Sequence, residues 1–348
     1  MPDIFNNHHI VIEGWYWVLR SNQVRRGHVK GVNLMGRELV IYRGEDGKVV
    51  ALDAYCPHMG AHLAGGRVEG NAIRCLFHYW KYDAQGQCID IPSLGGCPSF
   101  QVKTKTWIVE EQYGLIWIWV GERPRHPIPC VPELEHQSYR YRLGNRFTKR
   151  CHPHVVLINA IDEHHFNSVH DLPVFLAMEP KEISNSCIQF SNTSTIEPTS
   201  AFKRILRCFY SGPLTYSMTY WNGGAGTVTL GPDRLHFYIM FALRATEDGR
   251  TEGQTIFLTR RRRGVLGYCF DGVLLFLTRL VSNYFAKGDT LIFSTIRFNV
   301  KTPVKADRVI LRFIQHIENQ RTVAWRADGS NGKVAPIIPD SVSDALYR

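Results

Sequence analysis

Two short segments, Cys56-Pro-His58 and Cys75-Leu-Phe-His78, decide the fold of this chain of 348 residues, and sixteen residues separate them. Each segment supplies one thiolate and one imidazole, which are ligands for iron and zinc. Glycines and aromatic residues flank both segments. Glycine allows backbone amides to approach a metal-bound sulfur, and aromatic rings shield the site from water. The sequence therefore predicts a metal centre held between two loops.

The pairing of the ligands distinguishes two kinds of metal centre. In a Rieske [2Fe-2S] cluster, two cysteines hold one iron and two histidines hold the other. A zinc finger instead carries its two histidines together on a helix, as a His-x3–5-His pair. Here each histidine shares a segment with a cysteine, so the pattern favours the cluster. The predicted ligands, and with them an electron relay, are Cys56, His58, Cys75 and His78.

A second motif, Asn159-x2-Asp162-x2-His165-x4-His170, lies about eighty residues downstream on a predicted helical stretch. Asp162 and His165 are three apart and share a helix face, whereas His170 reaches the same point only if the helix loosens or bends. Two histidines and one carboxylate form the facial triad of non-haem iron(II) oxygenases. His165 and His170 are therefore predicted iron ligands, and His164 is interpreted as a structural residue.

The sequence from Gly14-Trp-Tyr-Trp-Val through both motifs to the region of Asp289 resembles the Rieske non-haem iron oxygenase alpha subunits. Within this family, Leu52-Asp-Ala-Tyr-Cys-Pro-His-Met-Gly-Ala-His-Leu and Tyr82-Asp-Ala-Gln-Gly-Gln-Cys88-Ile-Asp-Ile-Pro are similar to one branch. That branch contains the 3-ketosteroid 9α-hydroxylase oxygenases, the cholesterol 7-desaturases and aminopyrrolnitrin oxygenase. The resemblance implies two cofactors, a Rieske [2Fe-2S] cluster and a mononuclear Fe(II).

The resemblance also supplies a candidate for the third iron ligand. In the branch it is an aspartate that follows a long helix, and the matching stretch here is Gly288-Asp289-Thr-Leu-Ile-Phe293-Ser, with Phe293 where tryptophan is usual. Asp271 is the rival, but it lies inside the apolar run 265–281, where it is interpreted as facing water or ending a helix. Asp289 is preferred because a position after a helix presents a ligand better than one in mid-helix.

Two further residues receive roles from the family. The aspartate that matches Asp162 bridges a histidine of the mononuclear site and a cluster histidine of the adjacent subunit. Asp162 would thus join His165 to His78 of a neighbour, or, in the simpler reading, only orient His165. Asn159 is expected near the iron, with a capping or buried hydrogen-bonding role as the alternative.

The resemblance implies the oxygenase component of a Rieske monooxygenase. It would use O2 to hydroxylate, desaturate or N-oxygenate a hydrophobic or polycyclic small molecule that is steroid-like, an arylamine or an alkaloid. Electrons would come from NAD(P)H through a ferredoxin, a flavin reductase or both, and the alpha subunits would form a homotrimer. Two alternatives stay open. A Rieske-type electron-transfer protein should end soon after Val120, and a non-catalytic ligand-binding protein has no need of both motifs.

The apolar pattern predicts an α+β chain of two domains. Residues 1–125 would form an all-β Rieske domain, and the resemblance implies that residues 126–348 form a helix-grip catalytic domain, in which a curved antiparallel sheet wraps around helices. Between them, residues 122–132 contain four prolines and read as a linker. The predicted strands are 15–19, 38–42, 49–53, 72–74 and 115–120, followed by 139–147, 186–191, 201–210, 214–221, 226–230, 235–243 and 253–260.

Composition limits the possible partners and location. The net charge is +10, but the basic residues are scattered without a nucleic-acid-binding motif, so an acidic electron donor is a better partner than nucleic acid. The apolar run 264–285 is interrupted by Asp271 and Arg279 and is expected to be a core helix, with a peripheral membrane contact as the alternative, so no transmembrane segment is predicted. Without a signal-like start, the chain is expected in the cytoplasm.

Overall fold

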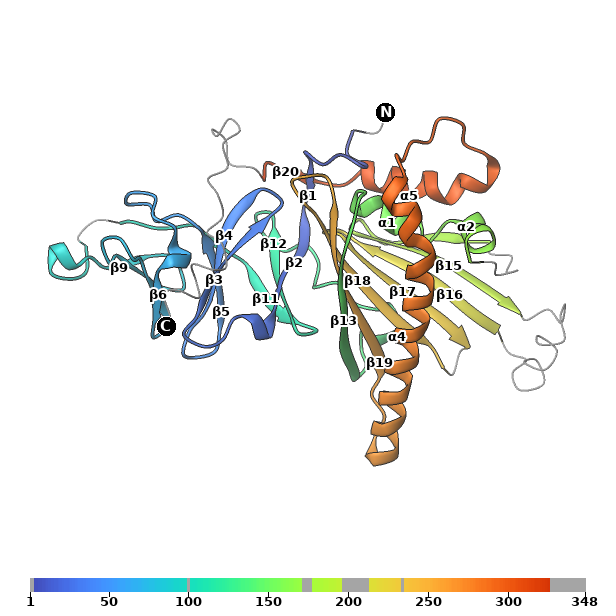
Figure 1. The fold of residues 1–348 in the computed structure, drawn as a ribbon, viewed down its shortest axis with the longest axis horizontal. Coiled ribbons are helices and arrows are strands. Elements are labelled where there is room, and N and C mark those ends of the chain that lie inside the picture. The colour runs from blue at the N-terminus through green and yellow to red at the C-terminus, as the bar shows by residue number, and fades with distance from the viewer. Residues whose placement is uncertain (1–2, 99–100, 171–176, 196–212, 233–234, 326–348) are drawn as a thin grey trace. The chain divides into compact units, whose positions relative to one another are not determined.

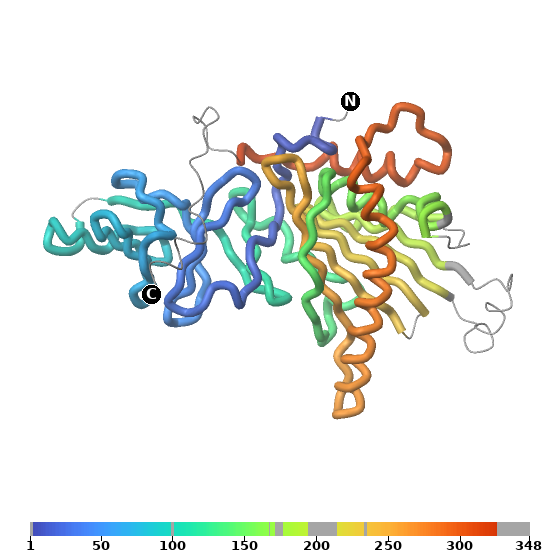
Figure 2. The backbone as a smooth tube through the Cα atoms, viewed as in Figure 1, coloured from blue at the N-terminus to red at the C-terminus, as the bar shows by residue number. Residues whose placement is uncertain are grey.

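The structure is a computed structural model, and it describes residues 3–98, 101–170, 177–195, 213–232 and 235–325. The chain forms two compact units, which are described separately below (Figures 1 and 2). Unit 1 comprises residues 1–17 and 119–323, and unit 2 comprises residues 18–118 and 324–348. The first seventeen residues therefore group with the second half of the chain.

Unit 2 is built from small antiparallel sheets. Their strand orders are β10-β5-β4-β3, β6-β7-β8-β9 and β11-β12-β2, and β2 and β12 continue into unit 1. The bounds are β2 (Gly14–Arg20), β3 (Val29–Leu34), β4 (Arg37–Arg43), β5 (Val49–Asp53), β6 (Arg67–Glu69), β7 (Ala72–Arg74), β8 (Lys81–Tyr82), β9 (Cys88–Asp90), β10 (Thr106–Trp107), β11 (Val109–Gln112) and β12 (Leu115–Val120).

The core of unit 2 lies between its two four-stranded sheets. Apolar runs place buried side chains on β4 and β5, where Val40 pairs with Leu52 across the antiparallel ladder. Ile73 and Tyr82, from β7 and β8, pack into the same cluster. Both motif cysteines belong to this cluster as well. The loops that bear the cluster motif therefore start from the rigid centre of the unit.

Unit 1 contains one seven-stranded sheet in which all neighbouring strands are antiparallel, in the order β13-β19-β18-β17-β16-β15-β14. The short strands β1 (Val11–Ile12) and β20 (Thr322–Val323) pair separately. With the helices, this is the expected α+β, helix-grip arrangement (Figure 1). The bounds are β13 (Tyr139–Lys149), β14 (Glu179–Ser184), β15 (Cys187–Thr195), β16 (Pro213–Trp221), β17 (Ala225–Pro232), β18 (Phe237–Ala245) and β19 (Thr251–Arg260).

The helices of unit 1 pack on this sheet through single apolar faces. α5 (Arg308–Glu318) buries Val309, Phe313 and Ile317, which recur every four residues and so lie on one face. They join Phe190 and Tyr220 of the sheet in the core. Two short helices, α1 (Pro153–Ile158) and α2 (Glu163–Ser168), lie between β13 and β14 in the chain.

The longest helix, α4 (Gly264–Thr295), differs from its prediction. The sequence predicts a core helix that ends near residue 285. The observed helix is 32 residues long, ends at Thr295 and contacts β13, β18 and β19 along one side. The buried positions recur every three or four residues, which is the spacing of one helix face: Asp271, Leu274, Leu275, Thr278, Ser282 and Phe293. The opposite face is exposed.

Strand predictions held where one or both faces are buried. The predicted strand 49–53 coincides with β5, and 115–120 coincides with β12. The predicted strand 201–210 lies outside the described residues. β14 was not predicted from the sequence, because its six residues are all exposed and carry no apolar pattern. α5 was not predicted either.

Candidate metal centres

Two hairpin-like loops of unit 2 carry the first motif. Backbone bonds close the first loop, because Cys56 N–H donates to Ala61 O and Gly60 N–H donates to Cys56 O, each at 2.9 Å. Gly60 has a φ of +72°, a conformation that glycine adopts without strain. The second loop is closed by Cys75 N–H, which donates to Trp80 O at 2.9 Å. Both loops are thus fixed by the backbone itself.

The ligand pairs of this motif differ in burial. Cys56 and Cys75 are 3% and 2% exposed, whereas His58 and His78 lie at the surface. The two imidazole rings have centroids 4.8 Å apart, and the ring of His58 stacks on Trp80 at 4.2 Å. Burial raises the pKa of the Cys75 thiol, so a bound cation is needed to hold it as a thiolate.

The spacing of the ligand atoms tests which metal fits. A single tetrahedral zinc, with bonds of about 2.0–2.3 Å, needs all four ligand atoms within about 4 Å of one another. Among the described residues, three ligand atoms lie within 4.8 Å of one another only at a different place, in unit 1. Two buried sulfurs and two exposed imidazoles that do not converge on one point fit a two-iron cluster.

Apolar side chains surround the two exposed histidines. Met59, Leu76, Phe77 and Tyr79, from the same two loops, are all exposed. Tyr82 lies on the inner side, where its hydroxyl is 3.1 Å from Cys56 Sγ and gives the sulfur a hydrogen-bond partner. Such a partner tunes the reduction potential of a cluster. No local pattern in the sequence indicates this contact of Tyr82.

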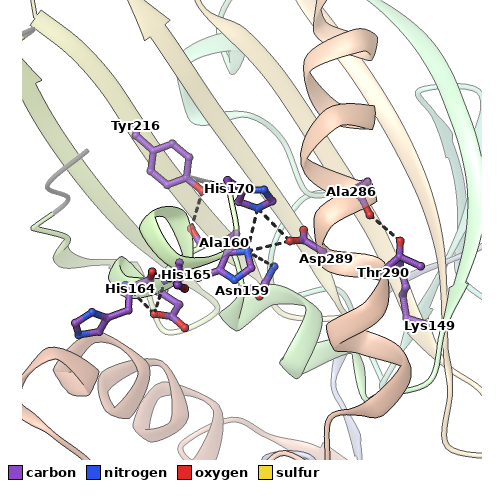
Figure 3. A network of polar contacts seen from close by, with 12 residues as sticks. Lys149, Asn159, Ala160, His164, His165, His170, Tyr216, Ala286, Asp289 and Thr290 are labelled. Carbon is purple, nitrogen blue, oxygen red and sulfur yellow. Dashed lines mark hydrogen bonds and ion pairs between the residues drawn. The ribbon is translucent and has the colours of Figure 1, made fainter. Parts of the chain in front are cut away.

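The three predicted ligands of the second centre converge in unit 1 (Figure 3). His165 Nε2 lies 3.0 Å from His170 Nε2 and 2.9 Å from Asp289 Oδ1. The distance from His170 Nε2 to the same Asp289 oxygen is 3.1 Å. Both histidines are buried, and burial is the main cause that lowers the pKa of His170. Three converging donor atoms, two imidazoles and one carboxylate, fit a non-haem iron(II) ion.

Short helices and a turn position the two histidines. Asp162 caps the N-terminus of α2, because its Oδ1 accepts the backbone N–H groups of His164 at 3.0 Å and His165 at 3.3 Å. The helix ends at Ser168, and His170 follows in a turn. The expected break in the helix before His170 is therefore present, and it brings the second imidazole to the first.

The structural setting of the carboxylate corrects the prediction. Asp289 does not follow a helix, because it lies within α4, six residues before the last helical residue. Asp271 neither faces water nor ends the helix. It is fully buried and forms an ion pair with Arg262 at 2.8 Å, and Arg140 lies 4.0 Å away. Asp271 is thus paired with arginines. Of the two aspartates, only Asp289 contacts the two histidines.

The remaining predicted site residue is Asn159. Its Nδ2 lies 3.0 Å from His165 Nε2, the ring atom that faces the other two ligands. Asn159 also follows the last residue of α1. Asp162 Oδ1 accepts two helix-capping hydrogen bonds. Among the described residues, Asp162 Oδ2 has no hydrogen-bond partner. His164 is exposed, as expected for a residue outside the site.

Several residues of this site were not found from the sequence. Gly288 allows close packing, because a Cβ atom there would lie 3.1 Å from Cε1 and Nδ1 of the His170 ring. Phe285 packs against the same ring with centroids 4.8 Å apart. Lys149 Nζ donates to Thr290 Oγ1 at 2.9 Å, and burial lowers the pKa of this lysine. Gly288 stands beside Asp289 in the sequence, but only the coordinates show what it contacts.

A cavity of about 570 Å³ opens beside the triad. All three ligands line it, together with Asn159. The remaining wall is largely apolar and comes from strands β13, β16, β17, β18 and β19 and from α1 and α4, with Phe147, Met218, Val228, Ile239, Phe257 and Phe285 among its residues. A volume of this size and an apolar wall with a few polar groups are typical of small-molecule sites.

Comparisons with known proteins support the cluster centre. Residues 14–101 match the family described as Rieske [2Fe-2S] domain. Cholesterol 7-desaturase from Bombyx mori is 40% identical over 161 residues, which are 45% of this chain and 35% of that protein. Aminopyrrolnitrin oxygenase from Pseudomonas fluorescens is 34% identical over 169 residues, 46% of each chain. The chain thus spans less than half the length of these curated relatives.

Solved structures share the fold over most of the chain. Dicamba monooxygenase bound to dicamba has a TM-score of 0.61 at 19% identity, covering 89% of this chain and 98% of that one. NdmB from Pseudomonas putida CBB5 has a TM-score of 0.63 at 17% identity, covering 91% and 93%. The predicted fold agrees with these matches, and the predicted cluster agrees with the Rieske domain match. Residues 14–101 are therefore a Rieske [2Fe-2S] domain, in a chain that is similar to cholesterol 7-desaturase and to aminopyrrolnitrin oxygenase.

Proposed function

We propose that this chain is the oxygenase component of a Rieske non-haem iron monooxygenase. The observation that supports this most directly is the convergence of His165, His170 and Asp289 beside an apolar cavity, in a chain that also has a Rieske domain. A protein that only carries electrons does not need the mononuclear iron site. A protein that only binds a ligand needs neither this site nor the cluster.

The proposed ligands are the ones predicted from the sequence. Cys56, His58, Cys75 and His78 would hold the cluster, and His165, His170 and Asp289 would hold the mononuclear iron. When bound, these two groups would supply single electrons and the activation of O2. Residues 1–125 and 126–348 remain the predicted limits of the cluster and catalytic domains.

The chain's own residues would orient the ligands and exclude water. Phe166 and Phe285 pack beside the ligand histidines, with Phe166 6.0 Å from His165 and Phe285 4.8 Å from His170 between ring centroids. Asn159 lies beside the ligand atoms and would contact substrate or O2 there. The capping bonds of Asp162 fix the start of α2 and hence the position of His165.

The substrate is proposed to be a hydrophobic or polycyclic small molecule, such as a steroid-like compound, an arylamine or an alkaloid. The apolar wall of the cavity supports this, because it offers few hydrogen-bond partners. The names of the relatives and structural neighbours include cholesterol, a 3-ketosteroid, aminopyrrolnitrin and dicamba. Hydroxylation, desaturation and N-oxygenation are all compatible with such substrates.

Partner proteins would supply the electrons. We propose a ferredoxin, a flavin reductase or both as donors that take electrons from NAD(P)H. The exposed histidines with their apolar rim offer a docking surface, and a net charge of +10 would attract an acidic donor. A homotrimer in the cytoplasm is the proposed assembly and location, in which Asp162 of one subunit would contact His78 of the next.

Iron content and turnover test the proposal. Protein purified anaerobically should be red-brown and contain about three irons per chain, whereas a Rieske electron carrier would contain about two. Cys56→Ala should remove the visible spectrum and leave one iron. With a reductase and NADH, product should form from a member of a panel of steroids, arylamines and alkaloids. A colourless protein with bound zinc would refute the proposal.

A further inference from the structure

The outward side of α4 is apolar, and none of the described residues covers it. Val265 and Leu266, in its first turn, are 80% and 87% exposed. The exposed apolar stripe continues along the helix, and we call the following residues the α4 outer face: Val265, Leu266, Val273, Phe276, Leu280 and Tyr284. In Figure 1 the first turns extend beyond the ends of β13 and β19. Exposed apolar patches of this extent mark interaction sites.

Arginines surround the beginning of the same helix. Arg260, Arg261, Arg262 and Arg263 directly precede it, and they line, with Arg140, a hollow of about 960 Å³. Arg262 is paired with Asp271, whereas Arg261 and Arg263 are exposed and have no ion pair among the described residues. Asp271 is buried, so no exposed carboxylate lies between residues 264 and 288. The whole face is therefore apolar and positively charged.

We propose that the α4 outer face and the arginines before it dock on the surface of an anionic phospholipid bilayer. Apolar side chains enter the boundary between headgroups and acyl chains, and neighbouring arginines bind lipid phosphates. Tyr284 and Tyr268 fit this position, because tyrosine favours membrane interfaces. The proposal concerns where the protein binds and does not depend on the oxidation proposed above.

Two observations define the mode of binding. α4 is long and apolar enough to span a membrane by length and composition, but the sheet covers one of its faces, so it would lie on the bilayer rather than cross it. A second copy of the chain is the other possible cover. A second copy carries the same net charge of +10 and is repelled by this arginine-rich face, whereas an anionic bilayer attracts it.

Vesicle flotation with the full-length protein tests this docking. Binding is expected to vesicles of 70% phosphatidylcholine and 30% phosphatidylserine, with little binding to phosphatidylcholine alone, and 0.5 M salt should weaken it. The double variant Leu266→Glu/Val273→Glu and the double variant Arg261→Glu/Arg263→Glu should each lose at least about tenfold in affinity. Leu311→Glu, which alters an exposed leucine on α5, is the matched control and should bind normally.

A fluorophore on Cys269, which is exposed in the first turns of α4, reports the contact directly in a Cys97→Ser background. Its emission should shift to the blue on addition of the anionic vesicles. Absence of binding, or equal binding by Leu266→Glu/Val273→Glu and the unchanged protein, would overturn the proposal. So would a lower oligomeric state of that variant in light scattering without a loss of vesicle binding, because a second copy would then cover the face.

Discussion

His165 Nε2 lies 2.9 Å from Asp289 Oδ1, although 124 positions separate the two residues in the chain. The contact joins α2 to α4, two helices that approach the seven-stranded sheet from different parts of the chain (Figures 1 and 3). Because each side supplies a ligand, an ion bound here would link both helices. Metal binding and local stability should therefore be coupled.

Asp289→Ala should empty the mononuclear site and abolish turnover while the cluster spectrum survives, because a three-ligand site has no redundant ligand. Iron analysis and visible absorbance separate the two centres. Asp271→Asn is the matched control on the same helix, since it keeps a hydrogen-bonding group beside Arg262. It should retain the mononuclear iron. Loss of this iron in Asp271→Asn but not in Asp289→Ala would show that the carboxylate was wrongly assigned.

Gly288→Ala should weaken mononuclear iron binding by about tenfold, as is typical for changes in the residues that support metal ligands. The added Cβ would lie 3.1 Å from the His170 ring and push the imidazole from its position. Alanine favours a helix more than glycine does, so the helix itself should not be weakened. Gly272→Ala is the control, because its added Cβ would have no atom within 4 Å apart from its chain neighbours and the backbone of its own helix. Equal iron affinity in both variants would contradict the argument.

Acid should destabilise unit 1 through buried histidines. Burial lowers the pKa of His154 from 6.5 to about 3, so between these values the unfolded chain binds a proton that the folded protein does not. Stability present above pH 6.5 is therefore lost progressively as the pH falls toward 3. Urea unfolding at several pH values measures this slope.

His154→Asn keeps an acceptor near the Nδ1 position, which now binds the backbone N–H of Asn6 at 3.2 Å. Below pH 6.5 this variant should show a slope shallower by up to about 1.4 kcal/mol per pH unit. Val155→Ala, which changes the neighbouring buried residue without removing a titratable group, should leave the slope unchanged. An identical slope in His154→Asn and the unchanged protein would rule out this histidine as a cause.

Sequence reasoning succeeded where the chemistry is local and failed where it depends on packing. The ligand types and spacings of Cys56, His58, Cys75 and His78 specify a cluster without any coordinates. The strands β5 and β12 carry buried apolar runs, and both were predicted at their observed bounds. β14 is an exposed edge strand with no apolar alternation, so its sequence resembles that of a loop.

The helix α4 shows why the setting of the carboxylate was wrong. The apolar run ends near residue 285, but the helix continues because its ladder of backbone bonds needs an apolar residue only where the helix packs on other parts of unit 1, as Phe293 does against Cys151 and Val155. Asp289 was chosen by resemblance, and only its convergence with two histidines shows its position. Gly288 and the cavity wall depend on contacts between distant segments, which no local pattern contains.

Asp162→Asn should keep both metals but lose most of the activity. Asparagine caps a helix about as well as aspartate, so α2 should remain intact, whereas the charge that is proposed to bridge His165 and a neighbour's His78 is removed. Asp162→Ala should in addition lower stability by about 1 kcal/mol. Glu163→Gln, which removes the adjacent carboxylate, is the control for activity. Full activity in Asp162→Asn would show that the charge of Asp162 is not needed and that this residue acts only as a helix cap.

Co-expression of two inactive variants, Cys56→Ala and His165→Ala, tests whether electrons cross between subunits. In a head-to-tail ring, some junctions of a mixed assembly would pair an intact cluster with an intact iron site. With random mixing, about a quarter of the junctions are of this kind, so activity should return to at most that fraction.

The control combines His165→Ala with Asp289→Ala. Both lesions lie in the iron site, so every such site is defective and the mixture should stay inactive. If the Cys56→Ala and His165→Ala mixture also stays inactive while mixed assemblies are present by mass spectrometry, transfer occurs within one chain and the ring has no electron-transfer role.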